Sequence, residues 1–373
     1  MIYLDNAATC REKPISVYRD MAFYTAFLSA NAGRGGHYLS IKAAEKISDT
    51  AIELAELFNI PSPASIAFTQ NATLALNMAI LGCGRGKHIV TTSMEHNSVL
   101  RPVNSLGHYT VVKADREGFV NPLKIKSAIR HDTGLIVISH ISNVCGSIQD
   151  IYAISAVAAE FGIPVLLDAA QSAGIADIDV EKMNISMLAF SGHKGLMGPL
   201  GTGGLYVRDE KMLEPVITGG TGSSSENLEQ PLNMPDILHS GTMNTPAIAA
   251  LGAGVRFIKK HTPAAILAHE RELAGKFISE LNNMDNVIVY GSNDISRRNG
   301  TVSFNIYNTD SNRVSDILND KYRILVRSGW HCAYTAHRTI GSENGAVRAS
   351  FGFFNTVRDV KRAVDAINDI RKR

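Results

Sequence analysis

Two segments of the sequence decide the fold, PVLLDAAQ at residues 164–171 and MLAFSGHK at residues 187–194. Each opens with an apolar run, which is typical of a strand buried in a parallel sheet, and each closes with polar residues. The first run ends in Asp168, and the second is followed by Lys194. Ligands of open α/β sheets bind beyond the carboxyl ends of the strands. The pattern therefore predicts an acid and an amine at one edge of a sheet.

Around these segments, short apolar runs alternate with stretches of helical periodicity. Strands are expected at residues 65–68, 88–92, 135–139, 164–167, 187–190 and 205–207, and helices at residues 40–58, 73–81 and 151–161. This alternation indicates an α/β protein with a mostly parallel sheet covered on both faces. A hairpin-like turn at residues 198–204 makes the strand at 205–207 a candidate exception to the parallel order. Residues 219–230, rich in Gly, Ser and acidic residues, are expected to form a loop.

The length of 373 residues exceeds what one core ordinarily holds, so we expect two domains. A long helix at residues 246–260 is expected to link them. Beyond it, the periodicity predicts helices at 264–282 and near the C-terminus, and strands at 287–290, 301–306 and 324–327. This second block is typical of a smaller α+β domain.

Bulk properties narrow the class of protein. Apolar residues make up 45% of the chain, and the formal net charge is +2. So small a charge gives no electrostatic basis for binding nucleic acid or an anionic membrane. No apolar run reaches membrane-spanning length and no signal peptide is visible, so a cytoplasmic protein is expected. The four cysteines are scattered, without a CxxC pair, and predict neither a disulfide scaffold nor a zinc ribbon.

A third element joins the acid and the amine. The strand at residues 65–68 runs through Asn71 into a helix whose first turn holds Ala72 and Thr73, and the free N–H groups of such a turn bind anions. An amine, an acid and a phosphate cup are what pyridoxal 5′-phosphate (PLP) needs. Plainer interpretations stay open, because Asp168 could be only a helix cap and Lys194 a solvated side chain. The Gly-rich residues 82–87 lack both nucleotide-binding spacings.

The segment RSGWHCA at residues 327–333 follows an apolar strand and contains a glycine, so it should form an exposed loop. This setting, with Arg327 and His331 as neighbours, favours partial exposure and thiolate character for Cys332, although a buried, inert cysteine is the commoner case. A metal site at His331, Cys332 and His337 has no support from known ligand spacings, and no metal is expected. Arg348 could be a structural ion-pair partner or a fork for a substrate carboxylate.

The sequence resembles the class V aminotransferase-type, fold-type I PLP enzymes, and within them the cysteine desulfurases and selenocysteine lyases. The similarity extends over essentially the whole chain, and its segments keep the family's order: residues 3–9, 69–77, 94–97, 140–146, 168–171, 191–194, 327–333 and 347–350. The resemblance implies a large PLP-binding domain with a mostly parallel sheet of the seven-stranded type at residues 15–255. Residues 1–14 and 256–373 would form a small α+β domain that carries the Cys332 loop.

The resemblance implies a set of cofactor contacts. Lys194 would hold PLP as an imine and shuttle a proton, and Asp168 would pair with the ring nitrogen. Gln171 would hydrogen-bond the phenolic oxygen. His96 would stack on the ring and act in acid–base steps, although a polar residue at a strand end is its plainer interpretation. The phosphate would be held by Ala72, Thr73, Ser191 and His193, with Thr242 reaching across from the other subunit of a homodimer.

The resemblance also implies the reaction. Asn143, Arg348 and Arg34 would bind the substrate, and the carboxylate of L-cysteine would lie against the first two. Cys332 would take the sulfur as a persulfide, leaving L-alanine, and an acceptor protein or a thiol would later remove the sulfur. Selenocysteine lysis, or C–S cleavage of a cystine-like substrate, fits the same scaffold and stays open. A catalytically idle binding protein and a true transaminase are less favoured, because neither has a use for Cys332.

Three departures from the family pattern lie near the expected substrate. Gly33 stands where familiar members with a short cysteine loop carry histidine, and Asn97 follows His96 where a second histidine is common. Residues 334–344 lie outside the segments that carry the resemblance. These differences leave the cofactor prediction intact and leave the choice of substrate open.

Overall fold

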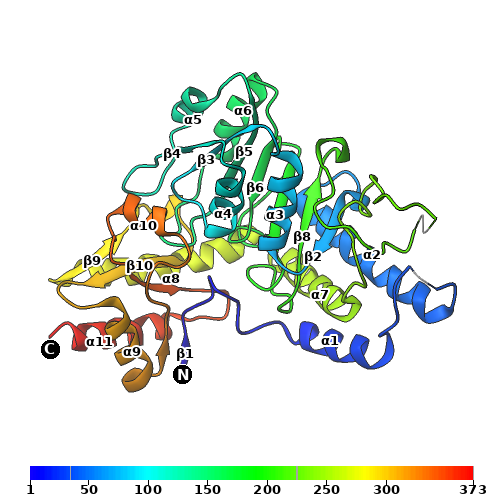
Figure 1. Cartoon of the computed structure of the whole chain (residues 1–373). Helices are drawn as coiled ribbons and strands as arrows, with labels where there is room; N and C mark the ends of the chain where they lie inside the picture. The colour runs from blue at the N-terminus through cyan, green and yellow to red at the C-terminus, as the bar shows by residue number, and fades with distance from the viewer. Residues whose placement is uncertain (34, 224–225, 373) are drawn as a thin grey trace.

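A computed structural model describes residues 1–33, 35–223 and 226–372 of the chain. A large sheet with helices on both faces forms one part of the molecule, and a smaller sheet with its own helices forms the other (Figure 1). Both chain termini lie in the smaller part. Among the described residues, no helix has the length and apolar character needed to cross a membrane.

Seven strands form the large sheet, as the resemblance predicted. In spatial order they are β2 (Ile66–Thr69), β8 (Gly203–Val207), β7 (Met187–Ser191), β6 (Val165–Asp168), β5 (Thr133–Ser139), β3 (His88–Thr92) and β4 (Tyr109–Val112). β8 runs antiparallel to both of its neighbours, and every other neighbouring pair is parallel. The candidate exception at residues 205–207 is therefore confirmed, and a mostly parallel α/β sheet is the fold class.

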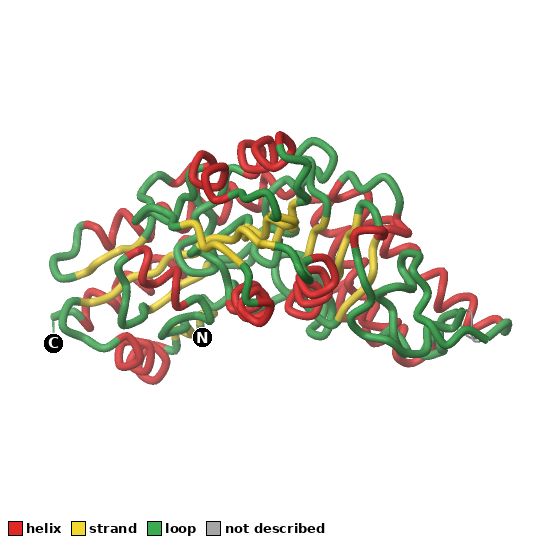
Figure 2. The backbone as a smooth tube through the Cα atoms, turned by 45° about the horizontal axis from the view of Figure 1, so that its top comes forward, coloured by secondary structure: helices red, strands yellow, loops and turns green. Residues whose placement is uncertain are grey.

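Consecutive residues of the central strands face opposite layers. Leu135 and Val137 of β5 pack with the helices α3 (Ala72–Cys83) and α4 (Asn97–Leu106). Ile136 and Ile138 pack on the other face, with α2 (Tyr38–Phe58), α6 (Ile151–Glu160) and α7 (Thr245–His261). Figure 2 shows helices above and below the strands of this sheet. Because both faces are covered, the strands read as continuous apolar runs, which is why the sequence located them.

The C-terminal part has an antiparallel sheet in the order β12 (Val347–Ser350), β10 (Thr301–Ile306), β9 (Val287–Tyr290). Its core contains residues of α8 (Pro263–Asn282), α9 (Ser311–Tyr322) and α11 (Val357–Ile370). The first residues of the chain belong here too, since β1 (Ile2–Tyr3) pairs in parallel with β11 (Ile324–Leu325). The domain boundaries at residues 15 and 255 stay a prediction.

The sequence did not predict the helices α4 and α9, the strand β1 or the edge strand β4. Nor did it predict the remaining elements, which are short or lie outside the main sheet layers. They are the helices α1 (Ile15–Phe27), α5 (Pro122–Ala128) and α10 (Tyr334–Ile340), and the 3₁₀ turns at Pro63–Ser65, Glu210–Met212 and Ile295–Arg297. The strand expected at 324–327 is shorter than predicted, because only Ile324 and Leu325 pair with β1. Arg327 instead forms an isolated bridge with Arg348. Within residues 219–230, those that the structure describes form no helix or strand, as expected.

Candidate active site

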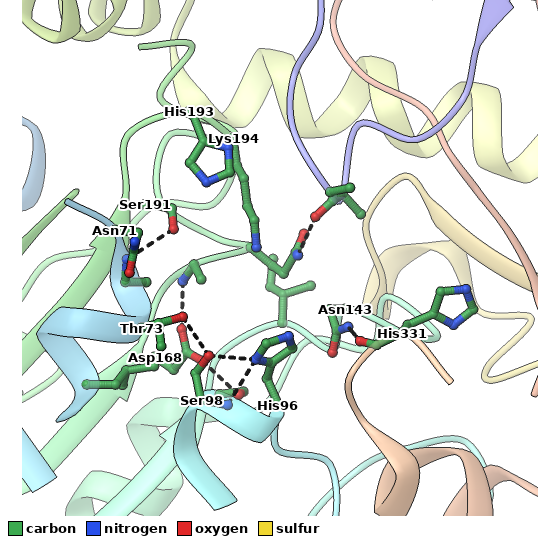
Figure 3. A pocket seen from close by; sticks show the side chains of 18 of the residues that line it. Asn71, Thr73, His96, Ser98, Asn143, Asp168, Ser191, His193, Lys194 and His331 are labelled. Carbon is green, nitrogen blue, oxygen red and sulfur yellow. Dashed lines mark hydrogen bonds between the residues drawn. The ribbon is translucent and has the colours of Figure 1, made fainter. Parts of the chain in front are cut away.

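A cavity of about 310 Å³ lies beyond the carboxyl ends of the large sheet's strands (Figure 3). Its walls come from the ends of β5, β6 and β7, from the starts of α3 and α4, and from the Cys332 loop. Ten of the predicted site residues line it: Ala72, Thr73, His96, Asn143, Asp168, Gln171, Ser191, His193, Lys194 and Arg348. The tertiary structure thus brings together residues from six separate segments of the sequence.

The predicted acid is buried, and the predicted amine is half-buried at the cavity wall. Asp168 is the last residue of β6, and its Oδ1 accepts a hydrogen bond from the Ala170 N–H at 2.9 Å. Burial raises the pKa of Asp168 above its usual range. Burial also lowers the pKa of Lys194 to about 8, against the attraction of Asp168. The cavity therefore favours the neutral amine more than water does, and a neutral amine is a nucleophile.

A buried acid that sequence reasoning missed lies behind Asp168. Glu95 accepts a hydrogen bond from the Ser139 hydroxyl at 2.7 Å, and a second from the hydroxyl of Thr92 at 2.5 Å. The Ser139 oxygen also lies 3.5 Å from Asp168 Oδ2. Burial raises the pKa of Glu95 to about 7. Glu95 was visible in the sequence next to His96, but only the pairing of β5 with β6 brings Ser139 between the two acids.

The first turn of α3 lies where the sequence predicted an anion cup. The Asn71 side chain caps this helix by accepting the N–H of Leu74 at 2.9 Å. The N–H of Ala72 points to the Ser191 hydroxyl at 3.3 Å, and the Thr73 hydroxyl lies 2.8 Å from that of Ser98. Hydroxyl and N–H donors thus converge at a helix N-terminus, where the helix dipole also favours negative charge.

Three further side chains complete the cavity wall. His96 caps α4 by accepting the Ser98 N–H at 3.1 Å, and burial lowers the pKa of His96 to about 4, so its ring is neutral at pH 7. His96 thus caps a helix four residues after the end of β3, and its ring lines the cavity as well. Gln171 donates to the Ala7 carbonyl at 2.9 Å, and His193 Nδ1 lies 3.1 Å from the Thr9 hydroxyl.

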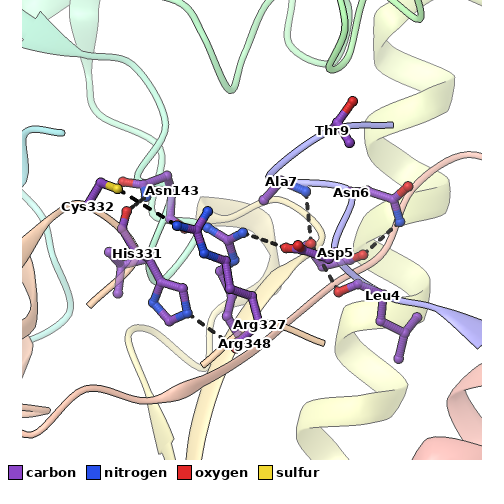
Figure 4. A network of polar contacts seen from close by, with 12 residues as sticks. Leu4, Asp5, Asn6, Ala7, Thr9, Asn143, Arg327, His331, Cys332 and Arg348 are labelled. Carbon is purple, nitrogen blue, oxygen red and sulfur yellow. Dashed lines mark hydrogen bonds and ion pairs between the residues drawn. The ribbon is translucent and has the colours of Figure 1, made fainter. Parts of the chain in front are cut away.

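Arg348 forms a structural ion pair, which is one of the two roles left open for it. Its guanidinium is 1% exposed and forms an ion pair with Asp5 at 2.7 Å (Figure 4). Nη1 donates to the Asn143 carbonyl at 2.9 Å, whereas Nε has no hydrogen-bond partner among the described residues. The residue also lines the cavity, so N–H groups beyond those already bonded are available for a carboxylate. The Asn143 amide donates to the carbonyl of His331 at 2.8 Å, which joins the cavity wall to the Cys332 loop.

The thiol of Cys332 is exposed, as the loop pattern predicted. Its sulfur lies 3.8 Å from Nη2 of Arg327, a residue that lines the cavity. Cys332 does not line the cavity itself. The loop positions the thiol outside the cavity and next to one of the residues that form its wall (Figure 4).

Besides Cys332, two further predicted site residues are not placed in this cavity. Thr242 lines a separate cavity of about 260 Å³ beside Gly241 and His239. Arg34 lies outside the described residues. Conversely, Arg327 and His331 line the cavity, although the sequence suggested for them only an influence on Cys332.

Known proteins resemble this chain in both sequence and fold. The family model for class-V aminotransferases matches residues 2–363. A probable cysteine desulfurase of Methanothermobacter thermautotrophicus is 33% identical over 382 residues, covering 99% of this chain and 94% of the relative. One from Pyrococcus abyssi is 33% identical and covers 100% of this chain and 94% of its own. The apo structure of a cysteine desulfurase from Thermococcus onnurineus NA1 superposes with a TM-score of 0.93 at 33% identity, over 100% of this chain and 94% of the other.

Proposed function

Since this chain belongs to the class V aminotransferase family, we propose that it is a PLP-dependent cysteine desulfurase, which converts L-cysteine to L-alanine and takes the sulfur onto Cys332. The names and coverage of its relatives support this proposal. The observation that carries it is the exposed thiol of Cys332 beside Arg327, at the wall of a cavity that holds Lys194 and Asp168.

The residues present fit PLP. The amine of Lys194 lines the cavity without a hydrogen-bond partner among the described residues, and Asp168 Oδ2 has only the 3.5 Å contact with Ser139. A cationic ring nitrogen would satisfy this carboxylate, Gln171 would face the phenolic oxygen, and Lys194 would bind the cofactor covalently. The phosphate would be held by Ala72, Thr73, Ser191 and His193. When bound, the cofactor supplies an aromatic ring that withdraws electrons from the substrate α-carbon.

The chain's own residues then bind and orient the substrate. The guanidinium of Arg348 and the amide of Asn143 would hold the carboxylate of L-cysteine. The Lys194 amine, with its pKa lowered by burial, would take the proton from the α-carbon and later return a proton to the product. The neutral ring of His96 would pack against the cofactor. Arg34 is proposed as a further substrate contact on the resemblance alone.

The sulfur step balances without a further reagent. The Cys332 thiolate attacks the substrate sulfur and forms an S–S bond. The substrate's C–S bond breaks, and its electron pair stays on the β-carbon, which gains a proton. The products are L-alanine and a Cys332 persulfide, and a thiol or a protein acceptor then removes the outer sulfur. The guanidinium of Arg327 lies 3.8 Å from Sγ, so this thiol stands next to a residue of the cavity wall.

We include two features of the assembly in the proposal. Thr242 lies away from the cavity of its own chain, so it is proposed to reach the phosphate site of a second copy in a homodimer. The protein is proposed to act in the cytoplasm. Sedimentation of the purified protein would test the dimer, and a monomeric holoenzyme would contradict it.

The activity is tested by incubating the purified protein with PLP and L-cysteine and measuring alanine and sulfide. Alanine should form, and the peptide that contains Cys332 should gain the mass of one sulfur atom. Cys332→Ser should abolish both, whereas Cys83→Ala, which removes a buried thiol of α3, should retain them. Loss of sulfide release in Cys332→Ser with retained selenide release from L-selenocysteine would favour the alternative, a selenocysteine lyase. No alanine from wild-type protein would reject the proposed function.

A further inference from the structure

A buried chain of hydrogen bonds lies behind the Cys332 loop. The Ser342 hydroxyl lies 2.7 Å from Nδ1 of His337, and Nε2 of His337 lies 3.0 Å from Nδ1 of His331. Nε2 of His331 then lies 3.3 Å from the carbonyl oxygen of Arg327. The two imidazole rings are stacked at 26°, with their centroids 5.1 Å apart. Every ring nitrogen of the pair therefore has one partner.

The hydrogen-bonding partners determine which atom donates in each of these hydrogen bonds. A carbonyl only accepts, so Nε2 of His331 must carry a proton toward Arg327. Burial lowers the pKa of His331 to about 2 and that of His337 to about 4, so both rings are neutral at pH 7. His331 Nδ1 must then accept from His337 Nε2–H, and His337 Nδ1 must accept from the Ser342 hydroxyl. Only one pair of tautomers satisfies all three contacts.

The loop segment that these hydrogen bonds hold in place has an unfavourable backbone conformation. His331 and Cys332 are consecutive non-glycine residues with φ of 48° and 58°, in the left-handed region. Such residues persist where the surroundings enforce them. Two backbone contacts do so here: the Asn143 amide donates to the His331 carbonyl at 2.8 Å, and the Asn97 N–H donates to the Cys332 carbonyl at 2.7 Å. The ring of His331 supplies the third fixed point, through His337.

His337 itself is fixed to the large sheet. It lies in α10, whose residues Ala336 and Ile340 pack in the hydrophobic cluster of that sheet. The Thr339 hydroxyl, from the same helix, lies 2.9 Å from that of Ser93, which follows β3. His337 therefore connects the loop that carries the thiol to the large sheet.

We propose that His337 is a positioning residue, which holds the Cys332 loop in its left-handed conformation through the ring of His331. With the backbone held at three points, Cys332 is left to reach substrate and acceptor by rotation of its own side chain. The inference rests on the proposed function, in which the Cys332 loop carries the sulfur. It concerns residues 334–344, a segment for which the family resemblance offered no role.

Three variants of the holoenzyme test the proposal. His337→Phe keeps a ring in the helix but removes both contacts, whereas His337→Gln retains a donor toward His331. His88→Phe is the matched control, because His88 is also a buried histidine with both ring nitrogens hydrogen-bonded. It lies at the start of β3, whereas the contact of α10 with Ser93 lies just after the end of that strand. Amide hydrogen exchange of residues 328–333 reports on the loop directly, and kcat and KM for L-cysteine report on its use.

We expect His337→Phe to speed exchange of the loop amides and to lower kcat by about tenfold or more, with KM for L-cysteine little changed, because a small displacement of a reacting group slows chemistry strongly. His337→Gln should recover most of both losses. His88→Phe should leave loop exchange and kcat near wild type. Unchanged loop exchange in His337→Phe, or equal losses in the Gln and Phe variants, would overturn the proposal.

A second measurement applies if His337→Phe does not fold. Nitrogen-15 spectra of the wild-type imidazoles should show both rings neutral and protonated at Nε2. Ser342→Ala leaves both histidines in place. It should shift the nitrogen-15 signals of His337 more than those of His331. A ring protonated at Nδ1 would refute the chain of contacts. Failure of the wild type to make alanine would reject the proposed function instead, while the spectra and the exchange data would still decide the role of His337.

Discussion

The backbone N–H of Asn97 donates a hydrogen bond of 2.7 Å to the carbonyl of Cys332. This contact joins the first residue of α4 to the loop that carries the exposed thiol. The preceding residue, His96, caps the same helix and lines the cavity. The start of α4 therefore positions a cavity-lining ring with one residue and the Cys332 backbone with the next.

Replacing Asn97 with proline removes this one N–H. The position tolerates proline, because it is the first residue of a helix and the preceding His96 already has φ −70° and ψ 155°. We expect Asn97→Pro to lower kcat for alanine formation by about tenfold. Asn97→Ala keeps the N–H and should behave as wild type. Equal activity of the two variants in a steady-state alanine assay would show that the contact has no part in positioning Cys332.

The lowered pKa of Lys194, about 8, makes cofactor attachment depend on pH. Between pH 7 and pH 9 the neutral fraction of such an amine rises by about tenfold and then levels off. The rate at which PLP becomes covalently attached to cofactor-free protein should follow the same course. Borohydride reduction and peptide mapping should identify Lys194, and Lys194→Arg should remain unlabelled. A rate that keeps rising to pH 10 would indicate an ordinary exposed lysine.

Arg348 should determine the affinity for the substrate carboxylate. Lysine at this position keeps the charge but loses the planar fork, so Arg348→Lys should raise KM for L-cysteine by about tenfold and change kcat less. Cysteamine, which lacks the carboxylate, provides the control, because its slow turnover should be the same in both proteins. If the variant loses activity on both compounds alike, Arg348 serves only its ion pair with Asp5.

Glu270 should make the protein less stable as the pH rises. This residue of α8 is fully buried, and burial raises its pKa from 4.5 to about 8, partly offset by the N–H of Gly300. The folded protein therefore binds a proton that the unfolded chain releases above pH 4.5, so the contribution to stability is complete below that pH. It is lost progressively as the pH rises through about 8.

Urea unfolding of Glu270→Gln tests this reasoning. The neutral amide keeps an acceptor for Gly300, so at pH 5 the variant and the wild type should be similarly stable. At pH 9 the variant should be more stable by about 2 kcal/mol or more, since each pKa unit corresponds to about 1.4 kcal/mol. Glu272→Gln is the matched control, because Glu272 lies two residues further along α8, is exposed and pairs with Lys276. This variant should show no such gain. A difference that does not grow with pH would contradict the assignment.

The sequence could predict most of the fold because the strands of the large sheet are covered on both faces. Each strand is then a short apolar run whose end is marked by the first polar residue, and Asp168 and Ser191 are both strand-end residues found in this way. Very short elements carry no such mark. The helix α10 and the two-residue strand β11 depend on contacts with distant segments, so neither could be assigned accurately from local periodicity.

By itself, the sequence determined the α/β class, the acid and the amine at one sheet edge, the anion cup before Thr73 and the exposed thiol, because each depends on residues adjacent in the chain. The tertiary structure alone decided which distant side chains meet. It placed Ser139 between Glu95 and Asp168, paired Arg348 with Asp5, and set His337 behind His331. These contacts join segments brought together by strand pairing and helix packing, and burial then sets the pKa values of their side chains.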